Sequence, residues 1–319
     1  MKARYLMGVD IGTYASKGVI VRPSGEVVSV QVRSHDLTIP RSGWAEHDAE
    51  AVWWGDFVAI TWELLRDAGL DPGQIAAVGC SAIGPDLLPV DAAGRPLREG
   101  GILYGIDTRA TDEIAELEAR HGADAIFKAT GNALTSQAVG PKLLWLKRHE
   151  PEVYHRAHVF VTATTFLVAR LTGQFLIDHL TAATWVPLYD LSNLAWSDRF
   201  CQGIVERDRL PKVAWATDVA GRVTAEAAAE TGLVEGTPVI VGTTDAPAEA
   251  VSVGVTAPGQ MMLMYGSTVF MIRVTNRLVT DRRLWAVPYL FPGTWCLEAG
   301  MSTSGALTRW FRDQCAPDL

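Results

Sequence analysis

The sequence predicts an α/β protein in which strands and helices follow one another in mixed order. Residues 5–9, 18–22 and 26–32 are three short apolar stretches joined by Gly-containing turns, with no room for a helix between them. Residues 48–69 have the apolar spacing of an amphipathic helix. Residues 261–274 repeat the N-terminal order of apolar strand, Gly/Ser/Thr turn and apolar strand, which indicates a weak internal duplication.

The remaining elements follow from local signals. The first three stretches predict an antiparallel meander, and the helix after them has Asp48 as its N-cap and ends at Gly69. A second domain is expected to begin near Pro258. Between them we expect further strands at residues 75–80 and 238–241, a hairpin-like pair at 87–90 that turns through 91–94, and helices at 109–120, 141–148 and 164–171.

Composition restricts the class of function. The 319 residues are 48% hydrophobic, enough for a large core, and the net charge of −8 with no Lys/Arg-rich run argues against nucleic-acid binding. The four cysteines form no C-x-x-C pair, so neither a zinc site nor a disulfide framework is indicated. No signal-like or membrane-spanning apolar run is present, so we expect a cytoplasmic protein with no membrane partner and a small-molecule substrate.

The turn between the first two predicted strands has the composition of a phosphate-binding turn. Glycine lets the backbone approach an anion, hydroxyl and amide groups donate to it, Lys17 adds positive charge, and Asp10 can hold Mg2+ through water. An ordinary hairpin is the alternative for such a turn in isolation. A second turn at residues 266–268 favours phosphate binding, because two facing hairpins can grip one phosphate chain. The residues concerned are Asp10, Gly12, Thr13, Ser16 and Lys17, and Gly266, Ser267 and Thr268.

A further polar motif follows the predicted strand at residues 238–241. Gly242, Thr243 and Thr244 lead to Asp245 at a strand-to-helix junction, a place where α/β proteins bind ligands. Asp245 could instead be only a helix N-cap, and one carboxylate can also serve both roles.

Motifs of several other enzyme classes are absent from the sequence, including the Walker loop, the dinucleotide fingerprint, the nucleophile elbow and H-E-x-x-H. Four motifs instead occur in an order and spacing that resemble the FGGY carbohydrate kinases, which include xylulose, glycerol and gluconate kinases. They lie at residues 10–13, 43–48, 102–110 and 242–245.

The resemblance implies an actin-like ATPase fold, in which two ribonuclease-H-like domains hold ATP and sugar in the cleft between them. Asp245 matches the family's catalytic base, and a carboxylate of ordinary basicity suffices there because the sugar proton leaves late in phosphoryl transfer. Asp10 and Asp245 are the expected Mg2+ ligands. The expected ATP-binding residues are Asp10, Gly12, Thr13, Ser16, Lys17, Gly242, Thr243, Thr244, Gly266, Ser267 and Thr268.

The resemblance says less about the sugar. Trp44, Asp107 and Arg109 match positions near the substrate, although Asp107 and Arg109 could instead form a structural salt bridge. Residues 81–86 match neither the xylulose-kinase nor the glycerol-kinase motif found there, so we expect Asp86 to be the replacement sugar ligand. A pentulose or related polyol is the expected substrate.

By the same resemblance, residues 1–253 form the sugar-binding and catalytic domain and residues 254–319 begin the nucleotide-binding domain. The sequence contains no counterpart of the family's Gly-rich adenosine-binding segment, so we expect the isolated chain to lack turnover. A homodimer or a separate C-terminal half is a candidate partner. The alternatives are a non-catalytic sugar-binding protein and one half of a split kinase, while a chaperone-like ATPase is disfavoured by the 43–48 and 102–110 motifs.

Overall fold

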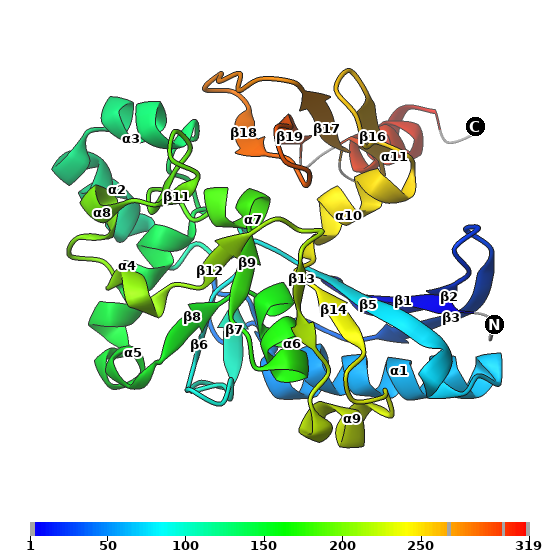
Figure 1. Ribbon diagram of the computed structural model, residues 1–319. Helices are drawn as coiled ribbons and strands as arrows, with labels where there is room; N and C mark the ends of the chain where they lie inside the picture. The colour runs from blue at the N-terminus through cyan, green and yellow to red at the C-terminus, as the bar shows by residue number, and fades with distance from the viewer. Residues whose placement is uncertain (1–3, 267–268, 302–303, 317–319) are drawn as a thin grey trace.

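The computed structural model describes residues 4–266, 269–301 and 304–316. Its largest sheet has the strand order β13-β14-β5-β1-β2-β3, with β15 also paired to β5 (Figure 1). The predicted antiparallel meander is confirmed, and β5 runs parallel to β1 next to it. The strands of this sheet are β1 (Tyr5–Ile11), β2 (Ala15–Val21), β3 (Val27–Ser34), β5 (Ile75–Ala82), β13 (Val219–Arg222), β14 (Pro238–Ile240) and β15 (Thr243–Thr244).

Helices α1 (Gly55–Ala68), α6 (Ala163–Thr172) and α9 (Ala225–Thr231) cover one face of this sheet (Figure 1). The predicted N-cap is confirmed, because the Asp48 carboxylate accepts a hydrogen bond from the Ala51 amide, and the helix starts with a π-helical turn, η1 (Ala49–Trp54). Gly69, at φ 60°, ends α1 as predicted.

The chain between β5 and β13 builds a mainly helical region on one side of the sheet, and two short elements, β4 and η2, precede β5 (Figure 1). The three predicted helices of this part are confirmed. The hairpin expected at residues 87–90 is wrong in part. β6 pairs with β8, and the chain that follows the turn forms only one isolated β-bridge with β6, between Val90 and Pro96. The elements are β4 (Glu46–Asp48), η2 (Pro72–Gln74), β6 (Leu88–Val90), β7 (Gly100–Ile102), α2 (Thr111–His121), α3 (Ala123–Thr130), α4 (Val139–His149), α5 (Pro151–Arg156), β8 (Val159–Val161), β9 (Leu176–Asp178), α7 (His179–Ala183), β10 (Tyr189–Asp190), β11 (Ala195–Trp196), α8 (Asp198–Cys201), η3 (Arg207–Arg209) and β12 (Lys212–Ala214).

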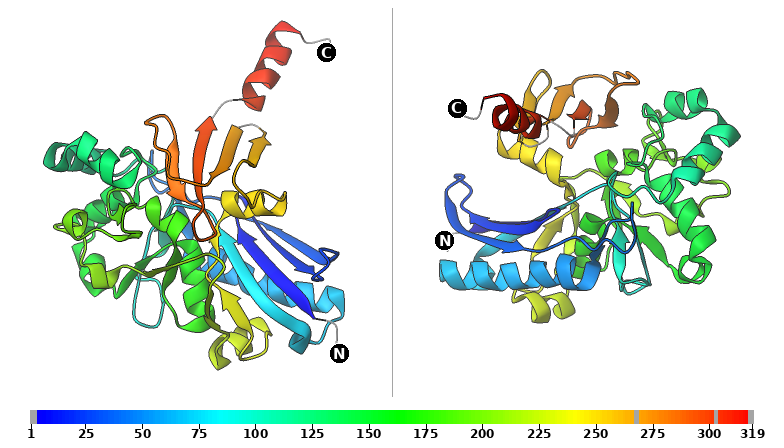
Figure 2. Two further views of the ribbon diagram at one scale, coloured as in Figure 1. Left: turned by 45° about the horizontal axis from the view of Figure 1, so that its top comes forward. Right: turned by 180° about the vertical axis from the view of Figure 1, so that it is seen from behind.

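A second, four-stranded antiparallel sheet follows α10 (Asp245–Ser252) and has the order β16-β17-β19-β18. The two strands predicted within residues 261–274 are confirmed, and the turn residues Ser267 and Thr268 lie outside the described part of the chain. Figure 2 shows α11 standing away from this sheet. The elements are β16 (Met261–Tyr265), β17 (Val269–Thr275), β18 (Trp285–Pro288), β19 (Trp295–Met301) and α11 (Gly305–Cys315).

Two apolar cores hold the protein together. One lies between the large sheet and α1, α6 and α9. The other joins the helical region to the inner face of the second sheet, since Ile272, Val287 and Cys296 belong to the same buried cluster as Leu180 and Trp185. Within residues 4–266, 269–301 and 304–316, no helix has the length and apolar character needed to cross a bilayer.

Candidate active site

The first hairpin places a carboxylate and a cation side by side. Asp10 at the end of β1 pairs in register with Lys17 on β2, and the Ser81 hydroxyl donates to Asp10 Oδ1 at 2.7 Å. Burial raises the pKa of Asp10, although the Ser81 hydrogen bond and Lys17 both act to lower it. The Gly12 amide closes the turn by donating to the Ala15 carbonyl.

A buried histidine supports this hairpin from behind. Trp53 Nε1 donates to His47 Nδ1 at 3.2 Å, so His47 Nε2 carries the proton and donates to the Thr13 carbonyl at 3.0 Å. Burial, aided by the neighbouring His35, lowers the pKa of His47 to about 4. The Thr13 hydroxyl lies 3.3 Å from the Tyr104 hydroxyl. The sequence motif at residues 43–48 contained His47, but no role could be assigned to it without this packing.

Ser16 does not face the ligand side of the hairpin. It is fully buried on β2, and its hydroxyl donates to the Asp56 carboxylate at 2.7 Å. Neighbouring residues of a strand point to opposite faces, so Ser16 points toward α1 while Lys17 points away from it. This geometry does not support the expected contact between Ser16 and ATP.

The junction between β15 and α10 is built by close backbone packing. Gly242 has φ 73°, and a Cβ at this position would lie 2.1 Å from the Cys80 carbonyl oxygen, so only glycine fits. The Thr243 hydroxyl donates to Asp178 at 3.1 Å, and the Thr164 hydroxyl donates to the Thr243 carbonyl at 2.9 Å. These bonds anchor the segment that presents Asp245.

Asp245 is the first residue of α10, and the N-cap position belongs to Thr244. The alternative in which Asp245 is only an N-cap is therefore wrong. Its Oδ1 accepts a hydrogen bond from the Ala246 amide at 2.8 Å. Burial, with the like charges of Asp10 and Glu249, raises the pKa of Asp245 to about 7. The expected ordinary basicity is thus corrected to a carboxylate poised near neutral pH.

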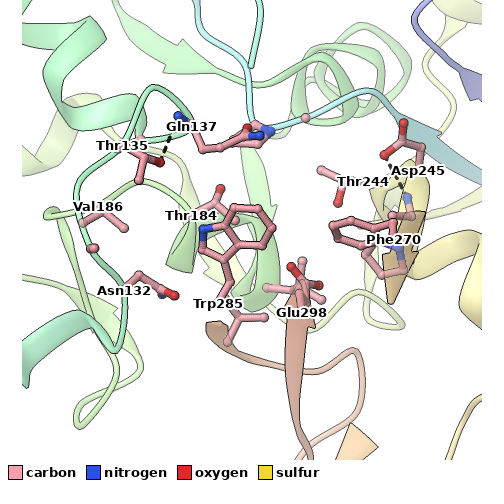
Figure 3. Close-up of a pocket in the computed structure, with 18 residues that line it drawn as sticks. Asn132, Thr135, Gln137, Thr184, Val186, Thr244, Asp245, Phe270, Trp285 and Glu298 are labelled. Atoms are coloured by element: carbon pink, nitrogen blue, oxygen red, sulfur yellow. Dashed lines mark hydrogen bonds between the residues drawn. The ribbon is translucent and has the colours of Figure 1, made fainter. Parts of the chain in front are cut away.

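Asp245 lies at the wall of a pocket of about 100 Å3 between the helical region and the second sheet (Figure 3). Most of the lining is apolar, with a small number of polar side chains, which is typical of small-molecule sites. The lining residues are Gly84, Pro85, Asn132, Ala133, Thr135, Gln137, Ala138, Leu180, Thr184, Val186, Thr244, Asp245, Ala246, Pro247, Phe270, Trp285, Val287 and Glu298.

Asp107, Arg109 and Trp44 do not line this pocket. The Arg109 guanidinium is fully buried, and it pairs with Asp107 and Glu46 at 2.7 Å each. It also lies 4.0 Å from the ring centroid of Trp44. The Asp107 carboxylate accepts the Ala45 amide at 2.8 Å. The structural salt bridge, kept as the alternative to sugar binding, describes this geometry.

Asp86 is also kept from the pocket, although its neighbours Gly84 and Pro85 line it. It is fully buried, and its two carboxylate oxygens lie 3.0 and 3.2 Å from the Ala163 amide. Burial raises the pKa of Asp86 to about 8, while the Ala163 amide and the buried Lys142 act to lower it. The expectation that Asp86 contacts the sugar is not supported by this orientation.

Asp10 and Asp245 are suited to hold a Mg2+ ion that keeps most of its water ligands, rather than one coordinated entirely by protein side chains. Among the described residues, no group of three or more His, Cys, Asp or Glu side chains is placed to hold a metal ion. The negative charge of Asp10 disfavours ionisation of the buried Asp245, and a divalent cation would relieve this repulsion. Mg2+ commonly takes one or two carboxylates and fills its other positions with water and phosphate oxygens.

The second expected phosphate turn is described only in part. Ser267 and Thr268 lie outside the described residues. The Gly266 carbonyl accepts hydrogen bonds from the Gly305 amide at 3.0 Å and the Ser304 hydroxyl at 3.2 Å. These bonds join the end of β16 to the start of α11.

Comparison with known proteins places the chain among sugar kinases. The model of the FGGY family of carbohydrate kinases, N-terminal domain, matches residues 5–252. The glycerol kinase of Nocardia farcinica is 29% identical over 97% of this chain and 62% of its own length. The autoinducer-2 kinase of Salmonella choleraesuis is 30% identical over 98% of this chain and 60% of its own length.

A solved structure has the same fold. The crystal structure of xylulose kinase from Rhodospirillum rubrum is 31% identical, with a TM-score of 0.92 over 99% of this chain and 64% of that protein. The architecture is therefore the mixed α/β, actin-like fold of the sugar kinases, as expected. The chain spans less than two thirds of the length of these relatives. The family model covers well over half of the chain, so this chain belongs to the FGGY family of carbohydrate kinases.

Proposed function

We propose that the chain is the sugar-binding and catalytic part of an ATP-dependent carbohydrate kinase, with Asp245 as the general base. The observation that carries the proposal is the position of Asp245. It borders the pocket of about 100 Å3, and its carboxylate lies within electrostatic reach of Asp10 on the hairpin expected to bind phosphate. A base with a pKa of about 7 is well matched to accepting a hydroxyl proton at neutral pH.

In this reaction Asp245 accepts the proton of one substrate hydroxyl while that oxygen forms a bond to the γ-phosphorus of ATP. The bond between the γ-phosphorus and the bridging oxygen breaks, and ADP leaves. Lys17 and the backbone of the first hairpin orient the phosphates, and Asp10 with Asp245 would hold hydrated Mg2+. The metal supplies charge neutralisation between the phosphates.

For the substrate we propose a small sugar or polyol of pentulose size. The pocket volume of about 100 Å3 suits a small molecule, and the relatives are named as glycerol, autoinducer-2 and xylulose kinases. We also propose that residues 1–253 and 254–319 belong to different domains, since the second sheet forms no hydrogen-bonded ladder with the first among the described strands.

The test is sugar-dependent ADP release by a protein of full family length that contains this chain. Asp245→Asn should lower kcat at least ~100-fold and leave sugar affinity nearly unchanged, because it removes the base but keeps the shape of the side chain. The matched control is Glu249→Gln, which removes a nearby acid on α10 and should change kcat less than about threefold. Retained turnover in Asp245→Asn would reject the general-base role.

A second candidate function is sugar binding without ATP binding. The chain would then be either a sugar-binding protein or one half of a split kinase. The chain as it stands spans 60 to 64% of the relatives' length. Calorimetric titration separates the two candidates, because this second protein would bind sugar and would not bind ATP with magnesium.

A further inference from the structure

Glu298 is an acidic residue on the apolar inner face of the second sheet. On β19, Glu298 pairs in register with Ile272 on β17 and with Trp285 on β18. Directly paired residues of neighbouring strands share a face, and so do alternate residues of one strand. Phe270, Trp285 and Val287 therefore share the face of Glu298, and all four side chains line the pocket of Asp245.

The carboxyl group of Glu298 has little to bind within the protein. The side chain is only 6% exposed. Among residues 4–266, 269–301 and 304–316, its one hydrogen-bond donor is the Cys296 thiol at 3.8 Å, and no cation pairs with it. A buried carboxyl group with such a weak partner costs folding free energy, so the fold does not explain why an acid stands here.

The surroundings of Glu298 favour a group that can donate as well as accept. Burial, the principal cause, and the nearby charges of Asp178 and Asp245 raise the pKa of Glu298 to about 7. Tyr289 and Cys296 also lie near it, and burial, with a smaller contribution from the charge of Glu298, raises the pKa values of both. At neutral pH a large fraction of the Glu298 carboxyl is therefore protonated and able to donate to an oxygen.

Other polar side chains of the pocket are already engaged with the backbone. Asn132 binds the Ala286 amide and carbonyl. The Thr184 hydroxyl donates to the Thr181 carbonyl, and Gln137 Oε1 accepts the Gly105 amide. Figure 3 shows Glu298 reaching into the pocket beside the rings of Trp285 and Phe270, with Asp245 on another wall.

We propose that Glu298 binds a second hydroxyl of the sugar or polyol, across the pocket from Asp245, and is a specificity-determining residue supplied by the second sheet. The inference rests on the proposed function. Since Asp245 begins α10 and Glu298 lies on β19, one bound substrate then bridges α10 and the second sheet. A compound with a single hydroxyl could not satisfy both acids.

The test is calorimetric titration of the 319-residue chain with glycerol, D-xylulose and D-gluconate, followed by variants titrated with the tightest binder. Glu298→Leu should weaken its affinity about 10- to 100-fold, the usual effect of losing a hydrogen bond to an ionisable group. The same change should leave the Tm unchanged or raise it, because an apolar side chain replaces a poorly partnered buried acid. If Glu298 had only a structural role, Glu298→Leu would lower the Tm and leave the affinity for the compound unchanged.

A second variant and a control keep the test decisive if Glu298→Leu does not fold. Glu298→Asp withdraws the carboxyl from the pocket by one methylene and should also weaken binding at least about fivefold. Met301→Ser alters an exposed residue of the same strand outside the pocket lining and should leave the affinity within about twofold. Unchanged affinity in both Glu298 variants overturns this inference alone, whereas a wild-type chain that binds none of the three compounds overturns the proposed function with it.

Discussion

His47 stabilises the first hairpin as a neutral imidazole. It accepts from Trp53 through Nδ1 and donates to the Thr13 carbonyl through Nε2, so protonation of Nδ1 would break the first of these bonds. Its pKa is about 4 in the folded protein, against an ordinary value of 6.5. Between these two values the unfolded chain binds more protons than the folded one, and acidification therefore favours unfolding.

We predict that His47 accounts for a loss of about 2 kcal/mol of unfolding free energy between pH 7 and pH 5. The contribution is fully present above pH 6.5 and is lost as the pH falls toward 4. In His47→Gln, which cannot titrate, the same acidification should have a correspondingly smaller effect. Urea denaturation followed by circular dichroism at both pH values measures the difference, and an identical pH dependence in the two proteins would contradict the prediction.

At the scale of an element, the packing of α1 on the first sheet depends on a glycine in β2. A Cβ at Gly18 would lie 2.2 Å from Ile60 Cγ2 and 2.9 Å from Leu64 Cδ1. Both side chains are fully buried, so neither can move without disturbing its neighbours. The same strand continues to Lys17 and the hairpin that we propose binds phosphate, which links helix packing to the position of the site.

We therefore predict that Gly18→Ala destabilises the protein by about 1–3 kcal/mol through overpacking. Gly8→Ala is the matched control on the adjacent strand β1, because a Cβ there meets Val19 Cγ1 at an ordinary 3.6 Å. Chemical denaturation of both variants tests the idea. Equal stability of the two variants would show that α1 can shift to admit the methyl group.

At the scale of the whole molecule, the inner and outer sides of the second sheet differ. The inner side belongs to the core shared with the helical region. The outer side and α11 expose large apolar side chains, and the chain covers 62% of the length of the Nocardia farcinica glycerol kinase. The exposed side chains are Met261, Leu263, Tyr265, Met301, Leu307, Trp310 and Phe311.

We predict that the isolated 319-residue chain binds sugar but shows no sugar-dependent ATP turnover. The pocket and Asp245 lie within the described residues, whereas the family resemblance places adenosine binding in a Gly-rich segment for which the sequence has no counterpart. A coupled assay for ADP release, with limited proteolysis in parallel, measures this. Cleavage should begin in the segment after residue 258, where exposed apolar side chains and a free sheet edge are concentrated. Robust turnover by the chain, with host kinases excluded, would contradict the prediction.

The sequence alone determined the features that depend on neighbouring residues. The meander, the N-cap at Asp48, the end of α1 at Gly69 and the paired strands within residues 261–274 all follow from turn chemistry and apolar spacing. The placement of Asp245 at a strand-to-helix junction is local in the same sense.

Only the tertiary structure decided which polar side chains reach the pocket. Asp86 and Asp107 have the composition of ligands, but packing buries both and pairs them with backbone amides. The pKa of Asp245 depends on Asp10, which is far away in sequence. Glu298 could be noticed as an acid among alternating apolar residues, yet its place in the pocket depends on how the second sheet packs against the helical region. Burial and charge proximity are properties of the packed molecule, and no local pattern encodes them.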